Sequence, residues 1–160
     1  MNFEIAIERA RNIQNEFPER HLCGSVGLKL TGVLPPYDVG DIDLVADFEY
    51  LNKLKRENRA NEKLLYSFTD HYYLECFTPH PHCLLFSHAH DLAVTVVDGL
   101  SVQDPQQMVT WKKGFNRPKD RATFEGLDGL WRRAIKNPPV KNMNVYWARH
   151  VALRLRGIEI

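Results

Sequence analysis

Long apolar stretches are missing from this chain of 160 residues. No uninterrupted apolar run approaches the roughly 20 residues that a helix needs to cross a bilayer, so we expect no membrane association. The first residues, Met1-Asn2-Phe3-Glu4, contain neither a basic cluster nor an apolar segment, which argues against a secretory signal. Cysteine is also scarce. Three residues, an odd number, do not build a disulfide framework and favour free thiols in a reducing compartment. We therefore expect a cytoplasmic protein.

Internal repeats and low-complexity stretches are absent as well. Hydrophobic residues make up 44% of the chain and charged residues 26%, which is close to the globular average and excludes disordered, collagen-like and coiled-coil classes. The length suits one compact domain. We predict a single domain over residues 1–160, with a core at about 20–125 and C-terminal helices at about 118–156.

The charges are distributed unevenly although the net charge is only +1. Residues 1–111 contain 9 Lys and Arg against 16 Asp and Glu, whereas residues 112–160 contain 12 against 4. Such a division can be a chance of layout. It also fits carboxylates gathered around a cation in the first part and phosphate contacts in the second.

Hydrophobic periodicity predicts an α+β fold, a mixed sheet flanked by helices with a helical C-terminal portion. Apolar residues at helical spacing, or helix start and stop signals, predict helices at residues 3–17, 26–30, 48–57, 105–113 and 118–136, and from about 144. Short apolar or alternating runs between Pro, Gly and His predict strands at residues 21–23, 41–46, 72–77, 83–86, 92–97 and 100–102.

The most informative segment is 21–47, HLCGSVGLKLTGVLPPYDVGDIDLVAD. A predicted strand ends at Gly24-Ser25, where glycine permits close approach of a ligand and the following helix start offers N–H groups to an anion. Asp41 and Asp43 lie two apart on another strand, so both carboxylates leave one face and repel each other unless a cation sits between them. Each feature alone is ordinary, a common turn or a solvated edge strand. Together they indicate phosphate and Mg²⁺ held side by side, as phosphoryl or nucleotidyl transfer requires.

These residues resemble the signature of the nucleotidyltransferase superfamily related to DNA polymerase β. The resemblance lies in Gly24-Ser25 followed by the acidic-apolar-acidic-apolar strand Asp41-Ile42-Asp43-Leu44. A second similarity begins at Asp104-Pro105 and continues through Lys112, Lys113 and Arg117-Pro118-Lys119-Asp120, which matches the ending of small bacterial and phage members. The resemblance covers residues 20–125 and implies the nucleotidyltransferase fold.

The resemblance also implies roles for individual residues. Gly24 and Ser25 would hold the triphosphate, and Asp41 and Asp43 would bind two Mg²⁺ ions. Family members usually add a third carboxylate on a later strand, as base and metal ligand. Glu75 is the best candidate for it, with Asp91 and Asp98 as alternatives. The positions expected at the nucleotide phosphates are Lys112 or Lys113, with Arg117, Lys119 and Asp120 either completing that wall or pairing with one another.

Two functions follow as expectations. The first is a Mg²⁺-dependent nucleotidyltransferase that moves a nucleoside monophosphate from an NTP to an acceptor hydroxyl. The acceptor is open among a small molecule, tRNA and a protein side chain. The alternative is an inactive module of the same fold that binds RNA or a protein partner. The loop 36–40 motivates it, because family members often carry Arg or Lys there and this chain has none.

Two other clusters have a structural and a functional interpretation. Cysteine and histidine gather at Cys76, His80, His82, Cys83, His88 and His90, but their spacing matches no common zinc module, and loop histidines are the simpler interpretation. The basic C-terminal part intersperses Arg and Lys with Trp131, Tyr146 and Trp147. That composition suits an RNA backbone with stacked bases, yet the aromatic spacing favours a helical core.

Overall fold

Strands of mixed direction form the centre of the computed structural model, which describes residues 1–57, 61–68, 71–77, 83–88 and 91–143. For residues 55, 61–68, 71–77, 83, 84, 87 and 88 only the backbone is described. The helices of this part are α1 (Phe3–Glu16), α2 (Gly24–Leu30), α3 (Phe48–Arg56), α4 (Pro105–Phe115), α5 (Pro118–Glu125) and α6 (Leu127–Lys136). The strands are β1 (His21–Leu22), β2 (Ile42–Asp47), β3 (Asn61–Phe68), β4 (His71–Phe77), β5 (Cys83–His88), β6 (Val94–Val97) and β7 (Leu100–Gln103).

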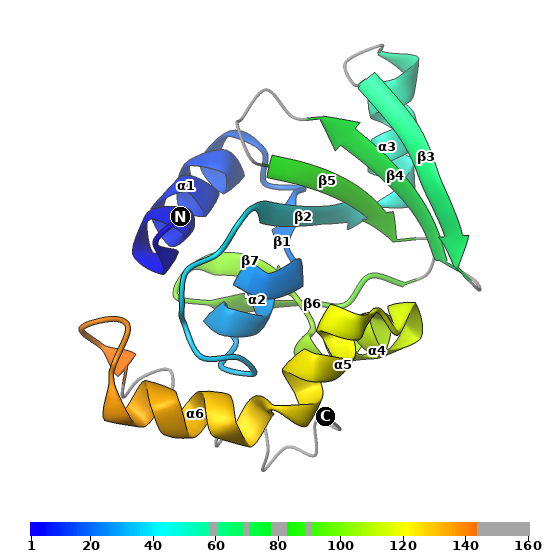
Figure 1. Ribbon diagram of the computed structural model, residues 1–160. Coiled ribbons are helices and arrows are strands. Elements are labelled where there is room, and N and C mark those ends of the chain that lie inside the picture. Colours follow the sequence, from blue (N-terminus) through cyan, green and yellow to red (C-terminus); the bar gives the residue numbers. More distant parts are fainter. Residues whose placement is uncertain (58–60, 69–70, 78–82, 89–90, 144–160) are drawn as a thin grey trace.

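The described strands form one seven-stranded sheet in the order β3-β4-β5-β2-β1-β7-β6 (Figure 1). Strand β2 is parallel to β5 and antiparallel to β1, and β1 is parallel to β7. The other neighbours, β3 with β4, β4 with β5 and β6 with β7, are antiparallel. The two-residue strand β1 therefore joins the four strands β3-β4-β5-β2 to the two strands β7-β6.

Helix α1 shows how the sequence pattern produces its element. Phe3, Ala6, Ala10 and Ile13 recur at helical spacing and are all buried. The side chain of Asn2 accepts a hydrogen bond from the Glu4 N–H at 2.7 Å and so caps the first turn. This packing covers part of the central sheet and contacts α2 and β7.

Helix α4 approaches α2 very closely, and a glycine permits the approach. A Cβ placed on Gly27 would lie 2.7 Å from the Met108 sulfur, so the Met108 side chain would have to shift to admit any other residue there. Farther along, the Trp131 indole of α6 donates to the Val33 carbonyl at 3.2 Å and is buried. In Figure 1, α4, α5 and α6 follow one another on the side of the molecule where α2 lies. The interpretation of Trp131 as core is thus supported, whereas Tyr146 and Trp147 lie outside the described residues.

The structure corrects several predicted boundaries. The predicted helix 118–136 is two helices, because Gly126 leaves the helical path between α5 and α6. Within α6, Ile135 is 50% exposed, whereas Ala134 is buried. Helix α4 runs past Gly114 and stops at Asn116, whose left-handed φ of 50° supplies the C-cap. Helix α2 starts at Gly24 and not at residue 26.

Strand β3 was not predicted at all. Its sequence, NEKLLYSF, has no alternation of apolar and polar residues, and only pairing with β4 makes it a strand. The α+β fold with a mixed sheet is confirmed, while the helix predicted from residue 144 lies outside the described residues. None of the described helices is both long and apolar enough to span a membrane.

Candidate active site

The bend after β1 is pressed against β2. Gly24 has a φ of +60°, which a side chain tolerates poorly. A Cβ at this position would lie 2.0 Å from Asp43 Oδ2, so the residue must be glycine for the carboxylate to stay in place. The preceding Cys23 N–H donates to the Asp43 carbonyl at 2.9 Å and fixes the two segments together. The glycine-serine bend and the acidic strand therefore meet as predicted.

The register of the sheet places residues of three strands beside one another near the Gly24 bend. Leu22 of β1 pairs with Leu44 of antiparallel β2 and with Val102 of parallel β7. Asp43, which precedes Leu44, and Gln103, which follows Val102, consequently flank the end of β1 from its two sides. Because α4 begins directly after β7, its residues cover the same end of the sheet.

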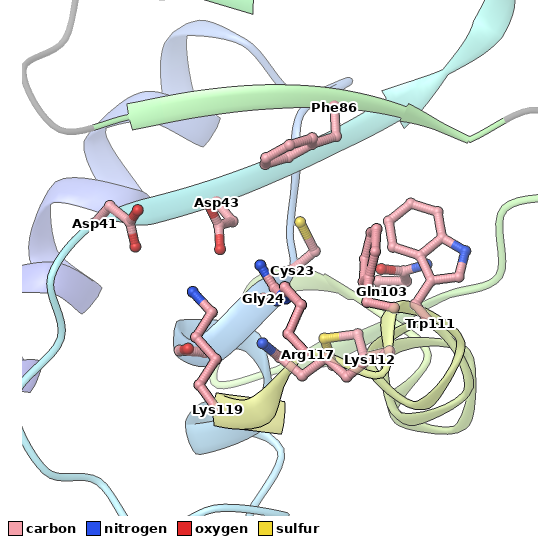
Figure 2. Close-up of a pocket in the computed structure, with 13 residues that line it drawn as sticks. Cys23, Gly24, Asp41, Asp43, Phe86, Gln103, Trp111, Lys112, Arg117 and Lys119 are labelled. Atoms are coloured by element: carbon pink, nitrogen blue, oxygen red, sulfur yellow. The ribbon is translucent and has the colours of Figure 1, made fainter. Parts of the chain in front are cut away.

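A cavity of about 210 Å³ lies between this end of the sheet and α4. Figure 2 shows Asp41 and Asp43 at one end of it and Gln103 and Trp111 at the other. The residues that line it are Cys23, Gly24, Ser25, Asp41, Asp43, Phe86, Gln103, Met108, Trp111, Lys112, Phe115, Arg117 and Lys119. Seven of the nine residues predicted at the site are in this set. The cavity thus has an acidic end, a cationic wall and an aromatic end.

The acidic end disfavours the charged form of Asp43. Burial, and next the charge of Asp41, raise the pKa of Asp43 from 3.8 to about 6, although Lys112, Lys119 and Arg117 act in the opposite direction. The three cations in the same cavity therefore do not offset the effects of burial and Asp41 on the pKa of Asp43. Two carboxylates placed together suit a hard divalent ion, which prefers oxygen ligands.

The cationic wall is built on a buried carboxylate. Asp120, only 3% exposed, accepts from Arg117 Nε at 2.6 Å and from the Arg117 terminal nitrogen at 3.0 Å, and Lys112 Nζ lies 3.7 Å from it. Burial, the largest influence, raises the pKa of Asp120, but the hydrogen bonds and charge of Arg117 and the charge of Lys112 outweigh it, and the net pKa is lowered. Asp120 thus pairs with Arg117 and Lys112 and fixes their positions. Lys119 has no ion-pair partner within the described part of the chain.

The thiol in the cavity is not a nucleophile. Cys23 is buried, and this burial, followed by the charge of Asp43, raises its pKa well above the ordinary value. Only the thiolate is strongly nucleophilic, so the sulfur remains an uncharged part of the wall. The chemistry of the cavity therefore rests on its carboxylates and cations.

Other predicted residues fall elsewhere. Lys113 lies on a neighbouring cavity with Asn116 and Glu125, not on the one with the acids. Glu75 belongs to β4, which β5 separates from β2, and its side chain is outside the described residues. Asp91 and Asp98 are exposed and do not line the cavity, and Asp98 sits in the turn at the far end of β7.

The described part of the chain contains no group of three or more His, Cys, Asp and Glu placed to hold a metal. In the predicted Cys and His cluster, His80, His82 and His90 lie outside the described residues, as do the side chains of the other three. The zinc interpretation of that cluster is therefore untested.

The aromatic end of the cavity was missed by the sequence interpretation. Phe86, Gln103, Trp111 and Phe115 come from β5, β7 and α4, and each is an ordinary apolar or polar residue of its element in sequence. The one available signal was Gln103, a polar residue at the end of an apolar strand. Only the fold shows that it is fully buried.

Neither the protein-family models nor the curated proteins compared with the chain give a match. Among solved structures, the chain is similar to a protein from Thermotoga maritima described as a "putative nucleotidyltransferase". The identity is 18% and the TM-score 0.52, with 78% of this chain and 93% of that one covered. At this identity the similarity establishes a shared fold, which is the fold that the sequence signature predicted.

Proposed function

We propose that this protein is a nucleotidyltransferase, which moves a nucleoside monophosphate from an NTP to an acceptor hydroxyl. One observation carries the proposal. Asp41 and Asp43 open into the same cavity as the Gly24 bend, opposite a cationic wall (Figure 2). The acceptor oxygen would form a bond to the α-phosphorus while the bond to the β-phosphate oxygen breaks, and pyrophosphate would leave.

The carboxylates would hold Mg²⁺, two ions by analogy with the family. The donor set fits, because both groups offer oxygen and Asp43 has its pKa raised to about 6 by burial and by the charge of Asp41. When bound, the ions would neutralise charge on the attacking and leaving oxygens.

The chain's own groups would position the triphosphate. Lys112 and Arg117, held by Asp120, and Lys119 present positive charge across the cavity from the acids. The small Gly24 and the hydroxyl of Ser25 leave room for phosphate oxygens beside Asp43. Fixed charges of this kind stabilise a phosphoryl group without rearrangement during the reaction.

The proton of the acceptor hydroxyl needs a base. Glu75 stays the prediction for this role. Its backbone lies on β4, the second strand from β2, where neighbouring strands are spaced by about 4.8 Å. Glu75→Gln, compared with Glu62→Gln on neighbouring β3, tests the prediction through the rate of transfer.

The function is tested by incubating the protein with each α-labelled NTP, Mg²⁺ and total tRNA or cell extract. We expect labelled product with the wild type and none with Asp41→Asn or Asp43→Asn. Asp38→Asn is the matched control, an exposed acid of the preceding loop that does not line the cavity. Undiminished transfer by the Asp41→Asn/Asp43→Asn double variant would exclude the proposed mechanism.

A second function has one specific observation in its favour. Strand β5, which pairs with β2 on the side away from β1, has the sequence CLLFSH and contains no acid. The fold would then bind RNA or a protein partner without turnover. Binding of RNA that weakens with salt, combined with no labelled product from any NTP, would favour this function over catalysis.

A further inference from the structure

The orientation of the Gln103 side chain is fixed by the main chain through Gln107. Gln107 Nε2 donates to the Asp91 carbonyl at 2.9 Å, and Gln107 Oε1 accepts from the Ala93 N–H at 3.1 Å. These two bonds leave no choice in which end of the Gln107 amide carries the oxygen.

Gln107 in turn orients Gln103. Gln103 Nε2 donates to the fixed Gln107 Oε1 at 3.4 Å, so the other end of the Gln103 amide must be its oxygen. Gln103 is fully buried and lines the cavity, and its Oε1 has no hydrogen-bond partner in the part of the chain described. A buried acceptor without a partner is destabilising and therefore points to a ligand that donates to it.

The cavity that Gln103 lines also has aromatic walls. Phe86 of β5, with Trp111 and Phe115 of α4, lines the same cavity, and Met108 adds a thioether. Figure 2 shows Gln103 and Trp111 at the end away from Asp41. Flat apolar walls around one polar acceptor suit a flat heteroaromatic ring that carries an N–H donor.

We propose that this end of the cavity binds the base of the nucleotide and selects a base with an amino group at position 6 of a purine or position 4 of a pyrimidine, adenine or cytosine. The inference rests on the proposed function, since the phosphates would have to lie at the acidic and cationic end. An amino group donates to Gln103 Oε1. The keto group of hypoxanthine or uracil at the same ring position would meet it with a second acceptor, which leaves both oxygens unsatisfied.

Two pairs of nucleotides differ in this group and in the hydrogen on the adjacent ring nitrogen: ATP with ITP, and CTP with UTP. Calorimetric titration in Mg²⁺ without acceptor should show about ten-fold tighter binding of the amino member in at least one pair. The pair that shows it identifies the base as a purine or a pyrimidine.

Two variants test the role of the amide. Gln103→Met has similar length and no acceptor, so the difference within the pair should fall below about two-fold. Gln107 does not line the cavity, so Gln107→Leu replaces no lining side chain, but it removes the bond that orients the Gln103 amide. That variant should bind the keto nucleotide more tightly than the wild type does, a gain that simple damage to the fold would not produce. Thermal unfolding of both variants checks that they are folded.

The outcomes separate the two proposals. Binding of NTPs with no preference within either pair, or a preference that persists in folded Gln103→Met, would overturn the base assignment and leave the nucleotidyltransferase proposal standing. If no NTP binds, or if binding is unchanged in Asp41→Asn and Lys112→Met, the proposed function itself fails.

Discussion

Asp43→Asn should stabilise the metal-free protein at neutral and alkaline pH while abolishing activity. Its raised pKa, about 6 against 3.8 in the unfolded chain, means that the fold favours the protonated acid, first because of burial and then because of Asp41. The stability contributed by this group is thus complete below pH 4 and is lost as the pH rises through about 6. Asparagine imitates the protonated acid and should escape that loss.

The size of the effect follows from the shift. A difference of about two pKa units corresponds to about 3 kcal/mol at most, at about 1.4 kcal/mol per unit. Partial exposure of the carboxylate and relaxation around the asparagine reduce this, so we expect a gain of about 1–3 kcal/mol at pH 8 and close to none at pH 4.

Urea denaturation in EDTA at the two pH values measures the difference, with Asp38→Asn as the control for removal of one negative charge. Added Mg²⁺ should stabilise the wild type and not the variant, because metal binding to the fold raises its free energy of unfolding. Destabilisation by Asp43→Asn at pH 8, or an equal effect at both pH values, would refute the view that the fold disfavours the charged form of Asp43.

Three further changes probe the parts around the acids. Gly24→Ala should cost about 2 kcal/mol in urea denaturation, because its φ is +60° and its Cβ would lie 2.0 Å from a carboxylate oxygen, whereas Gly40→Ala, with open space around it, should change little; equal losses would contradict this. Asp120→Asn should cost about 2 kcal/mol at neutral pH, since its pKa is lowered in the fold, and the loss should shrink as the pH falls below the ordinary carboxyl pKa; a loss independent of pH would count against it. Lys112→Met should weaken NTP binding about ten-fold and Lys113→Met less than two-fold, and the reverse order would move the phosphate wall to the neighbouring cavity.

The sequence was sufficient for the parts of the fold that depend on local order. The Gly24-Ser25 bend, the alternation through Asp41 and Asp43, and the proline start of α4 each combine a turn or cap signal with a periodic run. Their meeting was predicted from the spacing of the motifs, and the sheet register brings it about by pairing β1 with β2.

Other features depend on contacts between distant segments and leave no local pattern. Strand β3 exists because β4 pairs with it, and its polar residues would otherwise suggest a loop. The break at Gly126 was predicted as uninterrupted helix because an isolated glycine is tolerated in many helices.

The aromatic end of the cavity also depends on contacts between distant segments. For this reason the proposed choice of base could not be predicted from the sequence. An amide has two chemically opposite ends that look alike in sequence, and which one faces the cavity is decided by partners elsewhere in the chain. Here Asp91 and Ala93 fix Gln107, and Gln107 fixes Gln103, through main-chain groups that carry no side-chain signature. Related chains could therefore keep the acidic motif and change their base preference through the segment around residues 91–93 alone, without altering any residue that touches the nucleotide.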